Sequence, residues 1–468
     1  MNEKILVNKD HSCLKIDQNQ LKKVTNCLGQ TLLLEKRTLK AYFELKERLA
    51  SKRIEIDLAS GYRTFEEQQK IREEFQEQYG LDYVEKYVAR AGESEHHTGL
   101  CFDVFLRVEG KDLLENEDLL AKEREPLWQE IKKNLSSCGL ILRYPKEKER
   151  LTGYAYEPWH YRYVGKSTAQ RMEKEHLCLE EYDQKYHRSG ILLVNKPQGL
   201  TSREVVNHIS SVFDTKKVGH TGTLDPLATG VLVVTVNQAT KVSDLLMSAT
   251  KEYLAEVVVG KRTDTLDIEG KVLEEGSSLL DQEKLKEAFR IFPREYNQEV
   301  PLYSAKKVKG KKLYQYAREG KEVEIPRQHV ILYELELLEI KESSFRFRAL
   351  VSKGTYIRSL IRDLGTACQS LFTMSALTRT KQGNFTLDQC YSLEEITVDT
   401  PLLKIGEALS LKEAEIKKED QERLLNGHPM KNTYGVVDKV VFLCKGQEIA
   451  IYQREGEELK SYKKLNSI

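Results

Sequence analysis

Three residues in the first part of the chain have the types and spacing of a hydrolytic metal site. His96 and Asp103 lie in the segment 94–103 (SEHHTGLCFD), and His160 closes the segment 157–160 (EPWH). Two imidazoles and one carboxylate make a three-ligand zinc set that leaves the fourth position for water. A bound cation lowers the pKa of that water, which can then attack a carbonyl group. These residues therefore predict a zinc site with hydrolytic chemistry.

Two more side chains fit the same chemistry. Glu157 stands three residues before the last expected ligand and is placed to act as a general base. Arg63, in the segment 60–64 (SGYRT), is suited to stabilising an oxyanion or gripping a carboxylate. Taken singly, each of these residues also fits an ordinary surface or core position, so the prediction depends on their combination and order.

In that order, the motifs resemble the zinc D-alanyl-D-alanine carboxypeptidases and dipeptidases of the VanY type, over about residues 15–168. The resemblance implies cleavage of a peptide bond before a C-terminal D-amino acid, with peptides ending in D-alanine as partners and zinc as cofactor. It implies His96, Asp103 and His160 as zinc ligands, Glu157 as base, Arg63 as transition-state contact, and Ser94 and Gln68 on the substrate side. Two departures, Cys101 for the usual Ala and Thr64 for Ser, remove no ligand.

A second chemical signal is the loop 219–230 (GHTGTLDPLATG), which presents one carboxylate, Asp225. Its three Gly and one Pro predict a bent loop just before an apolar strand. The loop lacks the GxxxxGK[ST] order of a phosphate-binding loop. An Asp in this position suits a nucleophile, a base or a metal ligand, and alone the loop also fits an Asx turn.

Four motifs together resemble the tRNA pseudouridine synthase B (TruB) family over about residues 190–385. They are 190–202 (GILLVNKPQGLTS), 219–232 (GHTGTLDPLATGVL), 354–360 (GTYIRSL) and the tail 376–385 (ALTRTKQGNF). The resemblance implies isomerisation of uridine to pseudouridine at position 55 in the T loop of tRNA, with no cofactor for that reaction. Because the base must leave the folded loop to react, a pocket for an extruded uracil is expected.

The resemblance also implies roles for single residues. Asp225 would attack the ribose or the base, or stabilise developing charge, and Arg358 would keep Asp225 ionised and oriented. Tyr253 would stack on the uracil and take part in proton transfer, and His220 would brace the RNA where the base has left. The remaining residues expected on the substrate side are Thr223, Lys196, Lys353 and Tyr356. Two departures from the family pattern, Val300 before Pro301 and Thr378 before Arg379, concern RNA contacts.

Charge supports an RNA partner for the middle of the chain. Residues 189–385 hold 29 Lys and Arg against 24 Asp and Glu, whereas 386–468 hold 12 against 15. Lys and Tyr alternate through 303–318 (YSAKKVKGKKLYQYAR), a pattern suited to phosphates and stacked bases but also to a solvated face. The acidic end of the chain stands where a small PUA-like RNA-binding module is expected, and its charge predicts little bulk affinity for RNA.

The elements that position these residues follow from apolar periodicity. It predicts helices at 31–50, 127–138, 282–291 and 355–370, and strands at 231–236, 253–259, 329–340, 345–351, 436–444 and 447–452. The charged segment 167–188 predicts a solvated helix that leaves the first domain. From Ser189 and Gly190 onward, a strand, a tight turn and a capped helix are expected.

The expected fold class is α+β multidomain, with an N-terminal zinc peptidase α+β domain, a central mixed-sheet pseudouridine synthase domain and a small C-terminal PUA-like β domain. The predicted limits are 1–168 for the peptidase-like domain, 169–188 for a charged helical linker, 189–385 for the synthase domain and 386–468 for the PUA-like domain.

Composition restricts the compartment. The 468 residues are 40% hydrophobic and 31% charged with a net charge of +1, and no window approaches eighteen consecutive apolar residues. The first residues hold an apolar run too short for a signal peptide. Eight irregularly spaced Cys without a CxxC pair argue against a disulfide scaffold. A reducing cytoplasm is expected, with no membrane partner and no particular protein partner.

The leading hypothesis is a bifunctional enzyme. A different class remains open: a tRNA chaperone whose N-terminal half is a non-catalytic interaction module. A peptidase with a non-catalytic RNA tether is a second alternative, against which the intact set of Asp225, Tyr253 and Arg358 speaks. Accidental joining of two reading frames is a third, which a single polypeptide of about 54 kDa in native cells would exclude.

Overall fold

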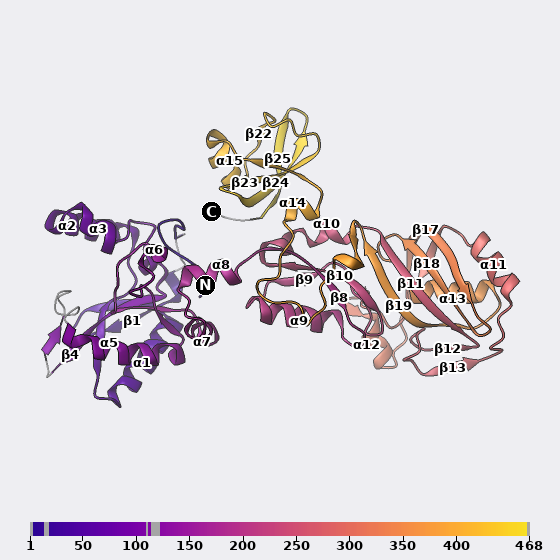
Figure 1. Cartoon of the computed structure of the whole chain (residues 1–468), viewed down its shortest axis with the longest axis horizontal. Coiled ribbons are helices and arrows are strands. Elements are labelled where there is room, and N and C mark those ends of the chain that lie inside the picture. Colours follow the sequence, from indigo (N-terminus) through magenta and orange to yellow (C-terminus); the bar gives the residue numbers. More distant parts are fainter. Residues whose placement is uncertain (1–2, 14–17, 109–110, 114–121, 466–468) are drawn as a thin grey trace. The chain divides into compact units, whose positions relative to one another are not determined.

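The computed structural model describes residues 3–13, 18–108, 111–113 and 122–465 (Figure 1). The described chain forms two compact units, divided between His187 and Arg188. The domain limits expected from sequence include a few positions that lie outside the described residues. These positions are at both chain ends and at 14–17, 109–110 and 114–121. In the described part of the chain, no helix combines the length and the apolar character needed to cross a bilayer.

The first unit is built on a five-stranded sheet of order β3-β4-β7-β6, with β5 paired to β4, and a separate hairpin of β1 and β2. Its strands are β1 Leu21–Thr25, β2 Thr31–Glu35, β3 Glu55–Ser60, β4 Cys101–Val108, β5 Lys111–Leu113, β6 Leu140–Leu142 and β7 His160–Tyr163. Its helices are α1 Lys36–Ala50, α2 Phe65–Tyr79, α3 Leu81–Tyr87, α5 Glu125–Leu135, α6 Glu149–Thr152, α7 Lys166–Lys174 and α8 Leu179–Tyr186.

The core of this unit lies on one face of the sheet. Phe102 and Val104 of β4, Tyr161 of β7 and the apolar sides of α1 and α5 form one buried cluster. Since side chains alternate along a strand, the neighbouring residues Cys101 and Asp103 lie on the opposite face. The sheet therefore separates an apolar core from a face that carries polar groups.

The sequence predicted one helix over 31–50, but residues 31–35 form β2 and the helix starts only at Lys36. These five residues pair with β1 along their whole length, so a tertiary hydrogen-bond ladder outweighs the helical periodicity. The predicted solvated helix over 167–188 also differs from the structure. The segment forms α7 and α8, and α8 buries Leu179, Tyr182 and Tyr186 against the first unit.

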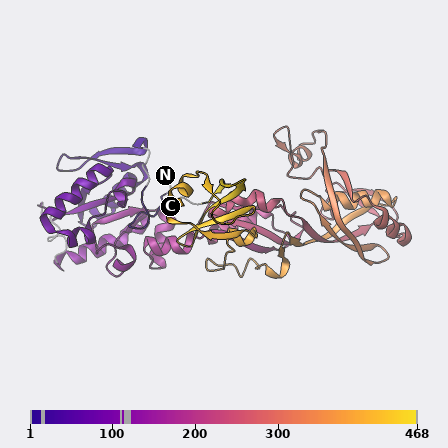
Figure 2. The ribbon, with the colours of Figure 1, turned by 90° about the horizontal axis from the view of Figure 1, so that it is seen from above.

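The second unit contains a nine-stranded sheet of order β14-β17-β18-β11-β19-β10-β8, with β9 paired to β10 and β20 paired to β19. Its strands are β8 Gly190–Lys196, β9 Val218–His220, β10 Thr229–Val236, β11 Lys251–Val259, β14 Glu295–Glu299, β17 Arg327–Ile340, β18 Ser344–Val351, β19 Phe372–Gln382 and β20 Phe385–Thr386. The short pairs β12 Lys261–Thr263 with β13 Val272–Glu275 and β15 Lys307–Val308 with β16 Lys311–Lys312 lie outside this sheet. Figure 2 shows the ribbon from above, with the second unit coloured from magenta through orange to yellow along the chain.

The helices of the second unit are α9 Ser202–Val212, α10 Ser243–Met247, α11 Gln282–Ile291, α12 Leu313–Arg318, α13 Ile357–Ala367, α14 Ile405–Ala408 and α15 Gln421–Asn426. Thr201 begins α9 in a capping box with Glu204, as the sequence predicted. The apolar sides of α11 and α13 pack on the part of the sheet formed by β11, β18 and β19.

The continuous apolar runs of β8 and β10 are explained by burial on both faces. Leu192 and Val194 of β8 face a core that includes Val205 and Ile209 of α9. Ile191 and Leu193, on the opposite face, belong to a second core.

That second core contains side chains from the end of the chain. Val441, Ile451 and Leu465 pack in it together with Ile191 and Val231. They come from, or directly follow, a five-stranded sheet of order β21-β23-β24-β25-β22. Its strands are β21 Lys412–Glu415, β22 Met430–Lys431, β23 Lys439–Cys444, β24 Gln447–Glu455 and β25 Glu458–Lys464. The short β strands expected here are present, and they pack as part of the second unit.

Candidate active sites

The first candidate site lies on the polar face of the sheet in the first unit. β4 and β7 are antiparallel, and their register pairs Asp103 directly with His160. His96 comes from a short 3-10 turn, Glu95–Thr98, just before β4. His96 and His160 are buried, and Asp103 is partly buried. Strand register therefore brings together residues that are far apart in the sequence.

The two oxygens of Asp103 lie between the two imidazoles. Oδ2 is 3.3 Å from His96 Nε2 and Oδ1 is 3.0 Å from His160 Nδ1. His96 Nδ1 is 2.6 Å from the carbonyl oxygen of Gly61, so Nδ1 carries the proton and donates, leaving the lone pair on Nε2. Nε2 and the carboxylate are then both acceptors, and Asp103 Oδ1 is a buried atom without a hydrogen-bond partner. A cation among these atoms satisfies all of them, so the residues fit zinc.

Glu157 lies beside the expected ligands. Its Oε2 is 3.6 Å from His160 Nδ1, and the side chain is buried. Burial raises the pKa of the Glu157 carboxyl from its ordinary value to about 7, against the opposing effect of the charge on His160. A carboxyl with this pKa can accept and release a proton near neutral pH.

Arg63 is oriented by several contacts. Its Nη2 donates to Ser60 Oγ at 2.8 Å and to Asp103 Oδ2 at 3.2 Å, and its Nη1 donates to Gln68 Oε1 at 3.2 Å. Gln68 in turn donates to the carbonyl oxygen of Ala89. Arg63 and Gln68 therefore form one polar chain that ends at Asp103.

Ser94 differs from the substrate contact predicted for it. It is buried and caps the 3-10 turn, where its Oγ accepts a hydrogen bond from the amide of His96. The sequence interpretation did not identify Glu95, whose Oε1 accepts from Arg143 at 2.7 Å and from Arg162 at 2.6 Å inside the unit. This fully buried ion pair lies behind His160, whose Nε2 is 3.8 Å from Glu95 Oε2. A carboxylate next to a metal-binding His was the signal that could have revealed it.

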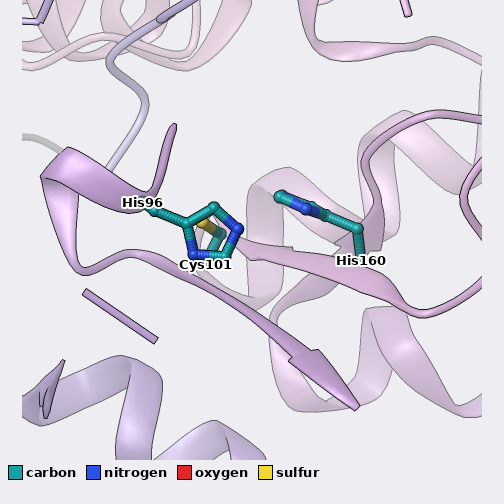
Figure 3. A group of neighbouring side chains, drawn as sticks. All are labelled: His96, Cys101 and His160. Carbon is teal, nitrogen blue, oxygen red and sulfur yellow. The ribbon is translucent and has the colours of Figure 1, made fainter. Parts of the chain in front are cut away.

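Cys101 joins the same group. Its Sγ and one ring nitrogen each of His96 and His160 lie within 4.8 Å of one another, and all three side chains are buried (Figure 3). The sequence interpretation noted this Cys only as a departure from the usual Ala.

The second candidate site lies in the second unit and is centred on Asp225. Arg358, from the first turn of α13, grips this carboxylate with two contacts. Its Nε is 2.9 Å from Oδ2, and its Nη2 donates to Oδ1 at 3.1 Å. The Arg358 side chain is only 6% exposed, whereas that of Asp225 is 35% exposed. The carboxylate therefore faces outward, and the guanidinium contacts it from the buried side.

Backbone carbonyls hold the rest of the guanidinium. Arg358 Nη1 donates to the carbonyl of Thr265 at 2.7 Å, and Nη2 donates to that of Tyr303 at 2.9 Å. Asp267 Oδ2 also lies near the guanidinium, 3.6 Å from Arg358 Nη1. Neither Thr265 nor Asp267 was predicted as a site residue, although both lie in the segment 262–270 with its three acidic side chains.

The loop is fixed on both sides of Asp225. Ser202 Oγ exchanges hydrogen bonds with the amide and carbonyl of Leu224. Lys196 donates from Nζ to the carbonyls of Pro197, Leu200 and Pro226. The carboxylate is therefore presented by a rigid loop.

Lys196 consequently differs from the substrate contact that the sequence predicted. Its ammonium group is fully buried and its three donors are used by backbone carbonyls, and burial lowers its pKa to about 8. It acts on the position of Asp225 instead of facing solvent. The side chain also borders a cavity of about 290 Å³ that Thr229, Thr378 and Leu393 help to line.

The other expected residues are distributed around this loop. Tyr253, on β11, is buried in the same apolar cluster as Leu224 and Leu227. His220 ends β9, and its Nδ1 accepts a hydrogen bond from the amide of Gly222. Tyr356 precedes α13 and is partly buried, whereas Thr223 and Lys353 are exposed.

The predicted Lys and Tyr strip forms β15, β16 and α12. Two cations lie near the ring of Tyr314, with Lys312 Nζ 5.6 Å and the Arg318 guanidinium 5.4 Å from its centre. Lys311 lies 5.0 Å from the ring of Tyr316. The strip thus combines aromatic faces with positive charge.

Comparison with known proteins assigns each unit to a class. Residues 31–166 match the family model described as D-alanyl-D-alanine carboxypeptidase, VanY. Residues 210–357 match the N-terminal domain model of the TruB family of pseudouridylate synthases. The chain therefore carries a VanY domain in its N-terminal part and a pseudouridine synthase domain after it.

Curated relatives refine the second assignment. tRNA pseudouridine synthase B of Caldanaerobacter subterraneus subsp. tengcongensis is 43% identical over 276 residues, which cover 58% of this chain and 97% of the relative. The enzyme of the same name from Caldicellulosiruptor saccharolyticus is 37% identical over 289 residues, covering 60% and 99%. The chain belongs to the tRNA pseudouridine synthase B family.

Solved structures resemble the two parts separately. A variant of the vancomycin resistance D,D-pentapeptidase VanY in complex with Zn(II) is 31% identical, with a TM-score of 0.33, and covers 39% of this chain and 99% of that one. An H/ACA ribonucleoprotein bound to a substrate RNA is 23% identical, with a TM-score of 0.45, and covers 62% of this chain and 88% of that one.

Proposed function

We propose that the second unit isomerises uridine to pseudouridine at position 55 in the T loop of tRNA. The observation that carries the proposal is the half-exposed carboxylate of Asp225, held by the buried guanidinium of Arg358 through two contacts. Family membership and relatives named tRNA pseudouridine synthase B supply the substrate. Because tRNA is that substrate, a cytoplasmic location is part of the proposal.

The reaction breaks the N-glycosidic bond and forms a C–C bond with the same uracil, which must stay in the site while it turns. Asp225 acts on the reacting nucleotide, either as nucleophile or by stabilising the charge that develops. Arg358 orients the carboxylate through its two contacts, since the planar guanidinium pairs with both oxygens. Tyr253 stacks on the extruded uracil and carries a proton, and His220 fills the place the base has left.

The wider RNA contact is assigned to charge and aromatic groups. The strip 303–318, Lys353 and Thr223 contact the tRNA backbone and neighbouring bases. Residues 386–468 are assigned as a PUA-like module after a synthase domain at 189–385. No cofactor is assigned to this reaction.

The test compares Asp225→Asn with the parent. The variant keeps the size of the side chain but loses its charge, so pseudouridine formation in a tRNA transcript should be abolished while tRNA binding persists. Asp388→Asn, at an exposed position of the same unit, serves as the matched control. Full turnover by Asp225→Asn would overturn the assignment.

The same variant separates catalysis from chaperoning. If Asp225→Asn refolds misfolded tRNA as well as the parent and the parent forms no pseudouridine, the chaperone alternative replaces the enzyme.

A second function rests on the first unit: we propose that residues 1–168 form a zinc-dependent peptidase for peptides ending in D-alanine. The observation in its favour is Asp103, which lies 3.3 Å from His96 Nε2 and 3.0 Å from His160 Nδ1 and has no hydrogen-bond partner on Oδ1. These three side chains would hold the ion. A bound Zn²⁺ polarises a carbonyl and lowers the pKa of water.

The chain's own residues supply the remaining steps. Burial raises the pKa of the Glu157 carboxyl to about 7. Glu157 removes a proton from the attacking water and donates it to the leaving amine. Arg63 offers donors at the edge of Asp103, where an oxyanion or a substrate carboxylate would be bound. Gln68 holds Arg63 in this orientation.

Hydrolysis of a D-alanyl-D-alanine peptide by Glu157→Gln tests the second function. We expect hydrolysis to fall by about 10²-fold or more, since proton transfer by a positioned group typically contributes this much. Glu147→Gln, an exposed Glu on the same unit, is the control. If the parent hydrolyses the peptide and Glu157→Gln does so at the same rate, Glu157 is not the base.

A further inference from the structure

The thiol of Cys101 is a nucleophilic side chain at the first site that the proposed peptidase chemistry leaves unused. This residue begins β4 and is fully buried. It stands two positions before Asp103 on the same strand, so the alternation of side chains places both on the same face of the sheet. The opposite face carries Phe102 and Tyr161, which belong to the apolar core. The thiol is therefore directed toward the polar site.

The geometry around this thiol is that of a ligand group. Cys101 Sγ and one ring nitrogen each of His96 and His160 all lie within 4.8 Å of one another (Figure 3). Ligand atoms around a tetrahedral zinc ion are separated by roughly 3.5 Å, given Zn–N and Zn–S bonds of about 2.0 to 2.3 Å. Side-chain shifts of about 1 Å close this difference.

The chemistry of the set agrees. Thiolate and imidazole are the ligands that zinc prefers in proteins, and a thiolate binds this ion in place of a harder oxygen ligand.

We propose that Cys101 is a fourth protein ligand of the metal ion held by His96, Asp103 and His160. The proposal rests on the proposed function in one respect, that this site binds a metal. With four protein ligands, the thiolate takes the position that a catalytic zinc site leaves open to water. The peptidase is then latent while the thiolate is bound and becomes competent when the thiolate leaves the ion.

Cobalt substitution in the full chain tests the ligation. The protein is stripped with a chelator and loaded with Co²⁺ alone, and its absorption spectrum and cobalt content are measured. A thiolate ligand gives a near-ultraviolet thiolate-to-cobalt charge-transfer band, which imidazole and carboxylate ligands do not give. We expect this band in the parent and its loss in Cys101→Ala, with cobalt still bound by the other three ligands.

Cys138→Ala is the matched control, because Cys138 is also a buried free thiol of the first unit and is not part of the ligand group. This variant should keep the band. Cobalt binding by the parent without the band, or a band that survives in Cys101→Ala, would overturn the proposal and leave the metal site intact. No cobalt or zinc in the parent would instead refute the metal site itself, and with it the ligation.

Peptide hydrolysis gives an independent readout of latency. Cys101→Ala opens the fourth position, so the metal-loaded variant should hydrolyse D-alanyl-D-alanine peptides faster than the parent. Equal or slower hydrolysis by a variant that has lost the band would overturn latency.

Discussion

Arg358 Nε lies 2.9 Å from Asp225 Oδ2, and Arg358 Nη2 donates to Oδ1 of the same carboxylate at 3.1 Å. The two residues are 133 positions apart in the sequence and come from a loop and a helix. The buried partner is the one with a permanent charge, and the exposed partner is the one that would meet the substrate. This arrangement fixes the direction of the Asp225 carboxylate.

Arg358→Lys keeps the positive charge but removes the planar guanidinium that contacts both oxygens of Asp225. A Lys has one nitrogen, so it cannot contact both carboxylate oxygens or reach the carbonyls of Thr265 and Tyr303 together. We expect turnover of tRNA to pseudouridine to fall by about 10²-fold, because a misplaced catalytic group costs on this order. Arg362→Lys, on the same helix and ion-paired with Glu299 and Asp363, should change turnover little. Similar losses in both variants would point to damage of α13 rather than of the pair.

Tyr253→Phe distinguishes the ring from the hydroxyl group. The ring stays in its buried position on β11, so tRNA affinity should be unchanged. If the hydroxyl carries a proton, turnover should fall by about 10²-fold in single-turnover assays. Tyr296→Phe, which removes a hydroxyl that donates to Asp363 from a partly buried side chain, is the control. Turnover by Tyr253→Phe as fast as that of the parent would limit Tyr253 to stacking.

Zinc content tests the first unit directly. Purified parent protein should hold about one zinc ion per chain by elemental analysis, since the described residues offer one set of converging ligands. His160→Ala should lose it, whereas His187→Ala, a partly exposed His of the same unit, should keep it. A parent without zinc even after supplementation would make this unit a structural or binding appendage.

Asp57 should make the stability of the first unit depend on pH. Burial alone would raise its pKa, but hydrogen bonds from Cys27, the Leu58 amide and Tyr42 outweigh burial and lower the pKa from 3.8 to about 2. A group with a depressed folded pKa stabilises the folded state above its unfolded pKa and loses this effect as pH falls through the folded value. Asp57→Asn should therefore lower the free energy of unfolding by about 2 kcal/mol at pH 7.

The difference between variant and parent should shrink as pH falls from about 4 toward 2. Urea unfolding followed by tryptophan fluorescence measures it within the full chain, because both tryptophans, Trp128 and Trp159, lie in the core of the first unit. A difference that stays constant over this pH range would show that lost packing, not lost charge, causes the effect.

Much of the fold was accessible from periodicity. The strands at 231–236, 253–259 and 345–351 and the helix at 282–291 form within the β10, β11, β18 and α11 ranges. These segments bury one or two regular faces, which a local pattern records. Residues 31–35 and 167–188 were misread because their burial depends on partners elsewhere, such as β1 for β2 and Arg143 for Glu180 of α8.

The site residues divide in the same way. The motifs predicted the pair Asp225 and Arg358 and the ligand set His96, Asp103 and His160. In the structure the members of each group lie close to one another. The buried position of Lys196 could not be predicted from the motifs. Its three partners are backbone carbonyls in turns, which no side-chain pattern marks. The proximity of Cys101 to two imidazoles likewise depends on the pairing of β4 with β7.

The core shared by β8, β10 and the final sheet limits how this protein can be dissected. Val441, Ile451 and Leu465 cover Ile191 and Val231, so a chain cut before β21 would bare an apolar face on the synthase sheet. Such a fragment should aggregate, and its inactivity would be mistaken for a lost RNA contact. The chain can be divided at the peptide bond between His187 and Arg188, because each fragment then keeps its own hydrophobic core.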